Sequence, residues 1–410
     1  MKKTILMIGI NGRFISSLEK SETKFELILI EEEDVFKTRT KKLESPLIRK
    51  IILAPYQQSN EALTIIDSVF KKYDIDAVVP GVEYAVGIAG EIARKFSLNY
   101  LGEKSISYLT DKYMLRTICE EYLLPQPNFV KVTSVKDIED FFDNKPIVIK
   151  PANRQASVGV IKVQTRDEIP EAFEKMIGSN EGRITAKRNM KWTYLAEEFQ
   201  DGFEVSVETL IKDGEVLFHN ITSKEVTGTP YFIESGHIVP GIVTKQQEQE
   251  IIKNQEKLIN ILVAQTGILH AEWIVTKEGP KLIECAGRVP GDDILTLIEH
   301  AYDFNVYENY IKMLCNMSTA IKTYAICGTA IKFFMPNAGI LEDIRNLDIL
   351  DKYKNEIIDF NITVNKGDTI PLLTSSWSRT AGYIIVKNKT NYQVKEFSDY
   401  LTNNIKFLVR

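Results

Sequence analysis

Residues 1–103 alternate between short apolar runs and longer amphipathic segments. The apolar runs have the length and composition of strands buried on both faces. They are residues 3–10, 25–30, 51–54 and 77–80, and the amphipathic segments are residues 60–73 and 82–96. Strands that alternate with helices predict a parallel sheet, so we expect a small doubly wound, Rossmann-like α/β domain. The glycine turn Gly9 to Gly12 lacks the full dinucleotide-binding pattern.

An antiparallel hairpin is the clearest pattern in the second half of the chain, at residues 268–295. Two β-rich runs, His270–Thr276 and Lys281–Cys285, flank the turn signal Lys-Glu-Gly-Pro. Residues 246–267 have the periodicity of an amphipathic helix. We therefore expect a helix that leads directly into the hairpin.

The rest of the pattern predicts shorter elements. Residues 194–199 and 204–211 read as strands around a turn that ends in Gly202, which suits a hinge between lobes; an ordinary hairpin is the alternative. Residues 222–240 are polar enough to predict a long loop. Beyond about residue 320 a small α+β appendage follows, in which residues 340–346 read as a short helix.

Composition and charge limit the classes of protein to which the chain can belong. With 410 residues it is too long for one ordinary core, and about two to four domains are expected. A net charge of −5 and the lack of a basic patch interleaved with aromatics argue against a nucleic-acid binder. The N-terminal apolar run ends at Asn11, too early for a signal peptide or a membrane span, so we expect a cytoplasmic protein. The four cysteines lie far apart without metal spacing and are expected to be reduced.

The hairpin carries the strongest candidate chemistry. Glu272 and Glu284 lie among apolar residues, where an uncompensated carboxylate is costly. A cation shared between neighbouring strands would satisfy both, and oxygen ligands without Cys or His favour Mg²⁺ or Mn²⁺. Arg288, four residues after Glu284, offers a forked donor for a phosphate or carboxylate. The alternatives are a surface hairpin with solvated acids, and an Arg288 that pairs with Asp292 or Asp293 to hold the next turn.

Three further positions carry weaker signals. Lys150 ends an apolar run and precedes a small, polar loop up to Gly159, whose N–H groups can converge on phosphate oxygens; a simple hairpin is the alternative. Glu83 follows the fourth apolar run, at the sheet edge where such folds hold ligands, but an acid that favours a helix N-terminus takes the same position. His237 lies in the predicted polar loop, where a histidine without a role is the usual case.

In their order along the chain, these motifs resemble the ATP-grasp superfamily, in which two α+β lobes hold ATP between them. The motifs are Asp111-Lys112, Ile149-Lys150-Pro151, the small-residue loop, Glu197-Glu198-Phe199 with Glu204, His270-Ala271-Glu272-Trp273, and LIECAGR at residues 282–288. The later runs AIKFF, GDTIPLL and GYIIV resemble the small C-terminal domain of the L-amino-acid ligase, or dipeptide synthetase, branch.

The resemblance implies an ATP-grasp fold of mixed α/β and α+β class with four parts. They are an N-terminal pre-ATP-grasp, Rossmann-like domain with a parallel sheet (1–103), the ATP-grasp small lobe (104–190), the large lobe with the metal site (191–318), and a small C-terminal α+β domain (319–410). We therefore expect the site to lie between the two lobes.

The resemblance also implies roles for single residues. At the nucleotide it assigns Lys112 and Lys150 to the phosphates, Ser157 to the loop that closes over them, Glu197 and Phe199 to adenine, and Glu204 to the ribose. It assigns Glu272 and Glu284 to two divalent ions (Mg²⁺ or Mn²⁺), Arg288 to catalysis at an acyl phosphate, and Glu83, His237, Arg288 and Gly291 to the substrate. Many relatives have an asparagine metal ligand where this chain has Ala286, so binding of two ions would depend on Glu284 and water.

The activity that the resemblance implies is that of an ATP-dependent carboxylate–amine ligase. It would activate the carboxylate of an amino acid or a similar small molecule as an acyl phosphate, couple it to an amine, and release ADP and phosphate. Three alternatives stay open: loading of an amino acid onto a carrier-protein thiol, carboxylation or phosphorylation of a small metabolite, and nucleotide binding without turnover. Besides small molecules, an acyl carrier protein and a second copy of the chain stay open as partners.

Overall fold

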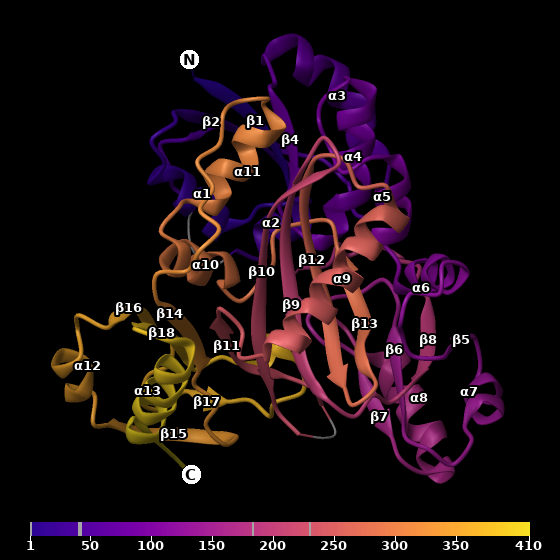
Figure 1. Cartoon of the computed structure of the whole chain (residues 1–410), viewed down its shortest axis with the longest axis vertical. Coiled ribbons are helices and arrows are strands. Elements are labelled where there is room, and N and C mark those ends of the chain that lie inside the picture. The colour runs from indigo at the N-terminus through magenta and orange to yellow at the C-terminus, as the bar shows by residue number, and fades with distance from the viewer. Residues whose placement is uncertain (1, 40–42, 183, 229–230) are drawn as a thin grey trace.

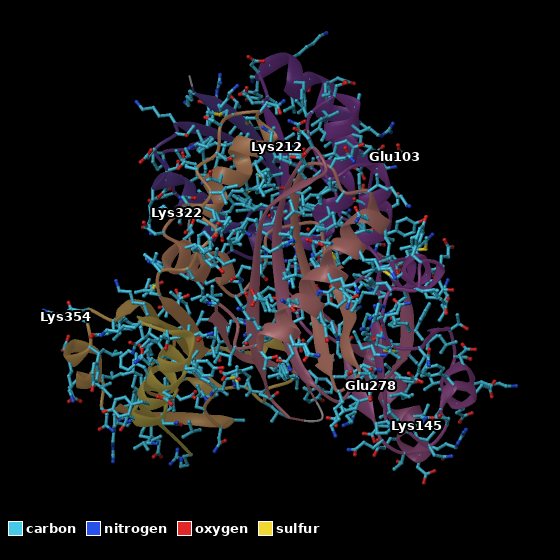
Figure 2. The ribbon with its side chains drawn as sticks, in the orientation of Figure 1. Glu103, Lys145, Lys212, Glu278, Lys322 and Lys354 are labelled. Carbon is cyan, nitrogen blue, oxygen red and sulfur yellow. The ribbon has the colours of Figure 1, made fainter. Side chains whose placement is uncertain are left out.

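Four β-sheets and the helices that cover them form the described part of the protein in this computed structural model (Figure 1). The structure describes residues 2–39, 43–182, 184–228 and 231–410. Charged side chains such as those of Glu103, Lys145 and Lys354 lie at the periphery (Figure 2). No helix within the described ranges is both long and apolar enough to cross a membrane. All four cysteines are free thiols.

The N-terminal sheet is parallel, as the alternation of strands and helices predicts, with the strand order β3-β2-β1-β4. The elements are β1 (Lys3–Ile8), α1 (Gly12–Glu19), β2 (Phe25–Glu31), α2 (Glu33–Lys37), β3 (Ile48–Leu53), α3 (Glu61–Lys72), β4 (Ala77–Pro80), η1 (Glu83–Ala85) and α4 (Val86–Lys95). In β1, Leu6 and Ile8 share a core with α3 and α4, whereas Ile5 and Met7 share one with α1 and α11 (Val306–Leu314). Both faces are buried, which explains why these strands are apolar without alternation.

A second, smaller sheet has the strand order β5-β8-β6-β7. The elements of this region are α5 (Glu103–Leu109), α6 (Lys112–Glu121), β5 (Phe129–Val132), α7 (Val135–Phe141), β6 (Ile147–Pro151), β7 (Ile161–Val163), η2 (Arg166–Glu168), α8 (Ile169–Gly178) and β8 (Tyr194–Glu198). Asp111 begins α6 by accepting a hydrogen bond from the backbone of Tyr113. The turn after β8 leads into a different sheet, so residues 194–211 do not form an ordinary hairpin, and a hinge between lobes stays a prediction.

The large sheet has the strand order β13-β12-β9-β10-β11-β14-β18-β16. Its strands are β9 (Phe203–Lys212), β10 (Glu215–Val226), β11 (Glu234–Val239), β12 (Gly267–Thr276), β13 (Gly279–Ala286), β14 (Gly328–Phe333), β16 (Ile357–Ile362) and β18 (Gly382–Asn388). The neighbouring helices are α9 (Lys245–Leu262), α10 (Ile294–Tyr302) and α11. Because β11 pairs with β14, the sheet runs without a break into the C-terminal region, and the four-part division stays a proposal.

The C-terminal region adds a small sheet of its own, with the strand order β17-β15-β19. Its further elements are β15 (Gly339–Arg345), α12 (Asp348–Lys352), β17 (Thr369–Ile370), η3 (Ser376–Ser378), α13 (Asn391–Asn404) and β19 (Lys406–Val409). Helix α13 packs on β14 and β18, so this region shares both a sheet and a core with the rest of the chain.

The predicted hairpin is confirmed as β12 and β13. Glu272 and Glu284 are direct partners across the two strands, which places both carboxylates on one face. Helix α9 leads into the hairpin and packs against it. There the buried indole of Trp273 donates a hydrogen bond to Gln255 at 3.1 Å.

Two predictions of secondary structure were wrong. Most of the loop predicted at residues 222–240 is strand, because β10 continues to Val226 and β11 begins at Glu234; Thr229 and Pro230 lie outside the described residues. The polar residues of β10 face a polar interior, so their polarity did not indicate a loop. The helix predicted at residues 340–346 is β15, which pairs with β19. Apolar residues at positions 340, 341 and 344 imitate helical spacing in this short strand.

The close approach of Gly81 to the glycine turn after β1 gives a stability prediction. A Cβ atom on Gly81 would lie 1.9 Å from the carbonyl oxygen of Gly9, so Gly81→Ala forces the backbone to move. We expect a loss of about 1–3 kcal/mol in the free energy of unfolding, measured by chemical denaturation. Gly12→Ala, where nothing lies within 4 Å, is the matched control. Equal stability of the two variants would contradict this packing.

Candidate active site

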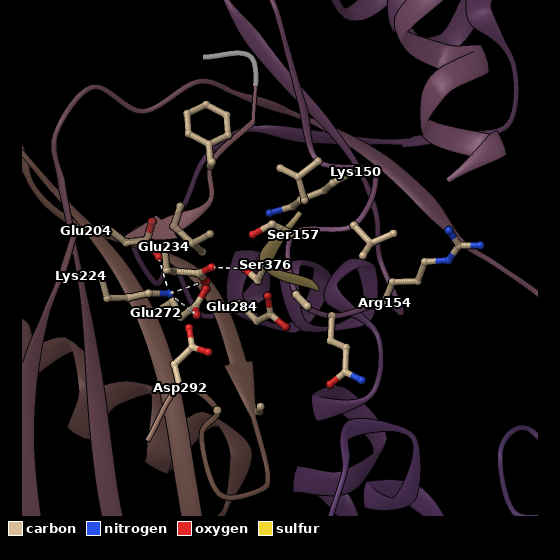
Figure 3. A pocket seen from close by; sticks show the side chains of 18 of the residues that line it. Lys150, Arg154, Ser157, Glu204, Lys224, Glu234, Glu272, Glu284, Asp292 and Ser376 are labelled. Atoms are coloured by element: carbon tan, nitrogen blue, oxygen red, sulfur yellow. Dashed lines mark hydrogen bonds and ion pairs between the residues drawn. The ribbon is translucent and has the colours of Figure 1, made fainter. Parts of the chain in front are cut away.

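A cavity of about 600 Å³ lies where the small sheet, the large sheet and the C-terminal region meet (Figure 3). Eleven of the residues predicted from the sequence line it: Lys112, Lys150, Ser157, Glu197, Phe199, Glu204, His237, Glu272, Glu284, Arg288 and Gly291. Glu83 lines a small adjoining pocket. The structure thus brings together residues that are up to about 200 positions apart in the sequence.

Glu197 is held between two buried cations. Its carboxylate accepts a hydrogen bond from Arg116 at 2.7 Å and pairs with Lys150 at 2.6 Å. Burial opposes the charge on Glu197, but the two cations keep the pKa of its carboxyl below the ordinary value. Burial, aided by Arg116, lowers the pKa of Lys150 against the pull of Glu197. This Glu197 clamp fixes Lys150 at the cavity wall, and the predicted contact of Glu197 with adenine stays a prediction.

Lys112 connects α6 with the hairpin and with the loop after β6. Its Nζ is 2.8 Å from Glu284 and donates a hydrogen bond of 2.8 Å to the backbone oxygen of Arg154. In the same loop, Ala156 and Ser157 have φ angles of 58° and 56°, in the left-handed region that side chains other than glycine rarely adopt. Strained backbone beside the ion pair of Lys112 and Glu284 is typical of a functional loop.

Lys224 lies at the centre of three carboxylates (Figure 3). Its Nζ is 2.6 Å from Glu204 and 3.7 Å from Glu234, and it also pairs with Glu272. The side chain of Lys224 is only 2% exposed. Burial works against its charge, but the acids raise the pKa of Lys224 well above the ordinary value, so the ammonium stays charged. Lys224 thereby offsets the repulsion among carboxylates that share one buried space.

His270 extends this network on the other side of Glu272. Its Nε2 is 3.3 Å from Glu272 and its Nδ1 is 2.9 Å from Glu208. Burial alone would lower the pKa of His270, but hydrogen bonds to these two acids raise it to about 9. Glu208 also accepts hydrogen bonds from Asn220 and Thr222 of β10. Glu208 and His270 therefore fix the orientation of the Glu272 carboxylate at the cavity.

Glu272 and Glu284 face the cavity, each beside a lysine. Among the described residues, no group of three or more His, Cys, Asp or Glu side chains is arranged to hold a metal on its own. Mg²⁺, however, usually takes one or two carboxylates and completes its shell with water and substrate phosphates. Two carboxylates on neighbouring strands, with no thiol among them, fit that donor set. Ala286 also lines the cavity and supplies no side-chain oxygen.

The other end of the cavity pairs Arg288 with Glu83. The Nε of Arg288 donates to the Glu83 carboxylate at 2.6 Å. Asp292 instead accepts two hydrogen bonds from Arg379, and Asp293 pairs with Arg13. The alternative in which Arg288 holds the turn through Asp292 or Asp293 is therefore wrong. The two predicted substrate residues Glu83 and Arg288 are therefore each other's partners, although they lie 205 positions apart in the chain.

Several cavity residues were missed by sequence reasoning. They are Lys224, Glu234, Arg379, Ser376 and Trp377. Lys224 was hidden in the segment predicted as a loop, although Asn220, Thr222 and Lys224 alternate with the period of a strand. Nothing in the sequence marks the C-terminal residues, because their position depends on the pairing of β11 with β14.

Removal of the Glu197 carboxylate tests the clamp. Glu197→Gln leaves Arg116 and Lys150 as two buried cations without a counter-charge, which should lower the free energy of unfolding by about 3–5 kcal/mol. The neighbour Glu198 accepts a hydrogen bond from Asn128 near solvent, so Glu198→Gln is a control expected to change by less than about 0.5 kcal/mol. Chemical denaturation of both variants decides; a similar small loss in both would refute the clamp.

Several known proteins are similar to this chain in sequence. Residues 143–296 match the family model described as an ATP-grasp domain. The L-arginine-specific L-amino acid ligase of Bacillus subtilis is 22% identical over 333 residues, which cover 79% of this chain and 78% of that protein. The D-alanine--D-alanine ligase of Coprothermobacter proteolyticus is 25% identical over 232 residues, covering 53% of this chain and 72% of that protein.

Two solved structures superimpose on this chain along its full length. The crystal structure of an L-amino acid ligase from Bacillus licheniformis superimposes with a TM-score of 0.81 at 19% identity, covering 100% of this chain and 99% of that chain. A phosphoribosylglycinamide synthetase from Anaerococcus prevotii has a TM-score of 0.71 at 18% identity, with 100% of both chains covered. This chain therefore contains an ATP-grasp domain and has the fold of the ATP-grasp ligases, which confirms the resemblance drawn from its motifs.

Proposed function

We propose that this chain is an ATP-dependent ligase that activates an amino-acid carboxylate as an acyl phosphate and joins it to an amine. The observation that carries this proposal is one cavity that holds lysines, paired carboxylates and an arginine beside an apolar compartment. Two relatives are named as ligases of amino acids, an L-arginine-specific L-amino acid ligase and a D-alanine--D-alanine ligase, which supports the same class of reaction.

The apolar compartment suits a nucleotide base. Side chains of both sheets and of the chain beside their strands line it, namely Val148, Val160, Phe199, Phe232, Ile274 and Ile283. The rings of Phe199 and Phe232 lie with their centroids 6.1 Å apart at 24°, which leaves a flat aromatic border. We therefore assign adenine to this compartment and the ribose to Glu204 at its edge.

The charged middle of the cavity suits the phosphates. Lys112 and Lys150 would bind phosphate oxygens, and the loop of Ser157 would exclude water from them. Glu272 and Glu284 would hold the divalent cations. When bound, Mg²⁺ supplies neutralisation of the phosphate charge. Lys224 and His270 would keep Glu272 ionised and oriented for that purpose.

The end with Arg288 suits the reacting groups. A substrate carboxylate oxygen would attack the γ-phosphorus of ATP, the bond to the β-phosphate oxygen would break, and ADP would leave. Arg288 would neutralise the acyl phosphate through its fixed guanidinium. The amine would then attack the acyl carbon and phosphate would leave. We assign Glu83, bonded to Arg288, as the counter-charge of the amine and the acceptor of its proton.

Loss of one metal-facing carboxylate should lower turnover strongly while the protein stays folded. We expect the wild-type protein to release ADP in the presence of Mg²⁺ and mixed amino acids, and Glu284→Gln to lower kcat on the order of 10²-fold. Glu278→Gln, at the exposed turn of the same hairpin, is the matched control and should keep full activity (Figure 2). Normal turnover by Glu284→Gln would remove this carboxylate from the metal site.

A trapping experiment tests the intermediate. Hydroxylamine added with ATP and a competent amino acid should yield a hydroxamate, because a strong amine captures an acyl phosphate. The nucleotide product should be ADP together with phosphate. Release of AMP and pyrophosphate would indicate an acyl adenylate and would refute the proposed reaction.

A further inference from the structure

We propose that Arg379 and Asp292 form an internally neutral wall at the substrate end of the cavity, which selects amino acids with uncharged side chains. This inference rests on the proposed function and adds the class of substrate. Arg379 lies in the C-terminal region, just after η3, and Asp292 lies in the turn before α10. Both side chains line the cavity.

The guanidinium of Arg379 has a partner at each nitrogen. It donates to the two oxygens of Asp292 at 2.7 and 2.9 Å, a bidentate pair. It also donates to the backbone oxygens of Ser376 at 3.0 Å and Glu234 at 2.9 Å. Its central carbon lies 3.8 Å from the centroid of the Phe333 ring. The charge of Arg379 is therefore already satisfied, and its position is fixed on every side.

Asp292 is satisfied in the same way. Besides Arg379, its Oδ2 is 3.2 Å from Nε2 of His237. Burial opposes the charge, but these two partners hold the pKa of Asp292 far below the ordinary value, so it is a carboxylate. The next acid, Asp293, pairs with Arg13, which also donates to the hydroxyl of Tyr383 at 2.8 Å. Charges at this wall are thus matched within the protein.

Two further charged residues near this end, Arg288 and Glu234, are already paired with Glu83 and Lys224, and the other lining residues here are uncharged. Phe333, Asn361, Thr363, Gly382 and Tyr383, from strands β14, β16 and β18 and the chain after β16, complete the lining. A charged substrate side chain would lose water here and find no unpaired counter-charge, which is costly. An uncharged substrate side chain loses less hydration free energy when it enters this end of the cavity. When one partner of a buried pair is removed, the charge of the other becomes available to a substrate. Asp292 without Arg379 should therefore favour basic side chains, and Arg379 without Asp292 should favour acidic ones.

A substrate panel tests the inference directly. ADP release is measured with neutral amino acids (alanine, serine, methionine), acidic ones (aspartate, glutamate) and basic ones (lysine, arginine). Arginine belongs in the panel because the relative from Bacillus subtilis is specific for it. We expect the wild-type kcat/KM to be highest for a neutral amino acid. A preference for an acidic or basic one would overturn the inference but leave the ligase function standing.

Two variants and their combination test the mechanism of selection. Arg379→Met keeps an apolar stem over Phe333 and uncovers Asp292, so the ratio of basic to neutral kcat/KM should rise on the order of 10-fold. Asp292→Asn uncovers Arg379 and should raise the acidic to neutral ratio by a similar factor. The double variant should return to the neutral preference. Equal loss for all substrates would make the pair purely structural and contradict its role in selection.

Folding is checked by the melting temperature and by ATP binding of each variant. If the variants do not fold, the wild-type panel alone decides between a neutral and a charged preference. If no amino acid stimulates ADP release by the wild-type protein, although ATP binds, the ligase function and the inference fail together. A failure of selection and a failure of function thus give different results.

Discussion

Compensation of charge within one cavity is the constraint on which this structure depends. Glu197, Glu272 and Glu284 lie where an unpaired carboxylate would be strongly unfavourable, and each has a cation beside it. These cations come from different elements: Lys150 lies near the end of β6, whereas Lys112 begins α6. Pairing of charges therefore holds the small sheet, α6 and the hairpin in place relative to one another. It also gathers lysines and acids at one surface, where a metal-bound nucleotide would take over the ion pairs that these residues now make with each other.

The same pairing joins the C-terminal region to the site. In the continuous large sheet β14 pairs with β11 and β18 pairs with β14, and this arrangement places Arg379 on Asp292 and Ser376 on Glu234. The small C-terminal region is thus part of the cavity wall and not an appendage. In the proposed reaction its contribution is recognition of the substrate, while the hairpin contributes the metal ligands.

The sequence predicted those parts of the site that rest on local pattern. The hairpin and the N-terminal sheet follow from periodicity and turn signals within short segments, and the acids Glu272 and Glu284 follow from their position among apolar residues. Lys224 was missed because a polar strand that faces a polar cavity looks like a loop. Arg379 was missed because its position comes from pairing between distant strands, which no local pattern encodes. Roles that only the family resemblance implies, such as that of Ser157, stay predictions.

Calorimetric titration of ATP with and without Mg²⁺ tests most directly whether this cavity is a site for metal-bound nucleotide. ATP alone would bring its negative charges against Glu272 and Glu284, which face the cavity beside Lys224 and Lys112. We expect ATP to bind at least about 10-fold more tightly with Mg²⁺, and Glu272→Gln to remove most of that gain. Equal affinity with Mg²⁺ and with a chelator, or an unchanged gain in Glu272→Gln, would contradict the assignment.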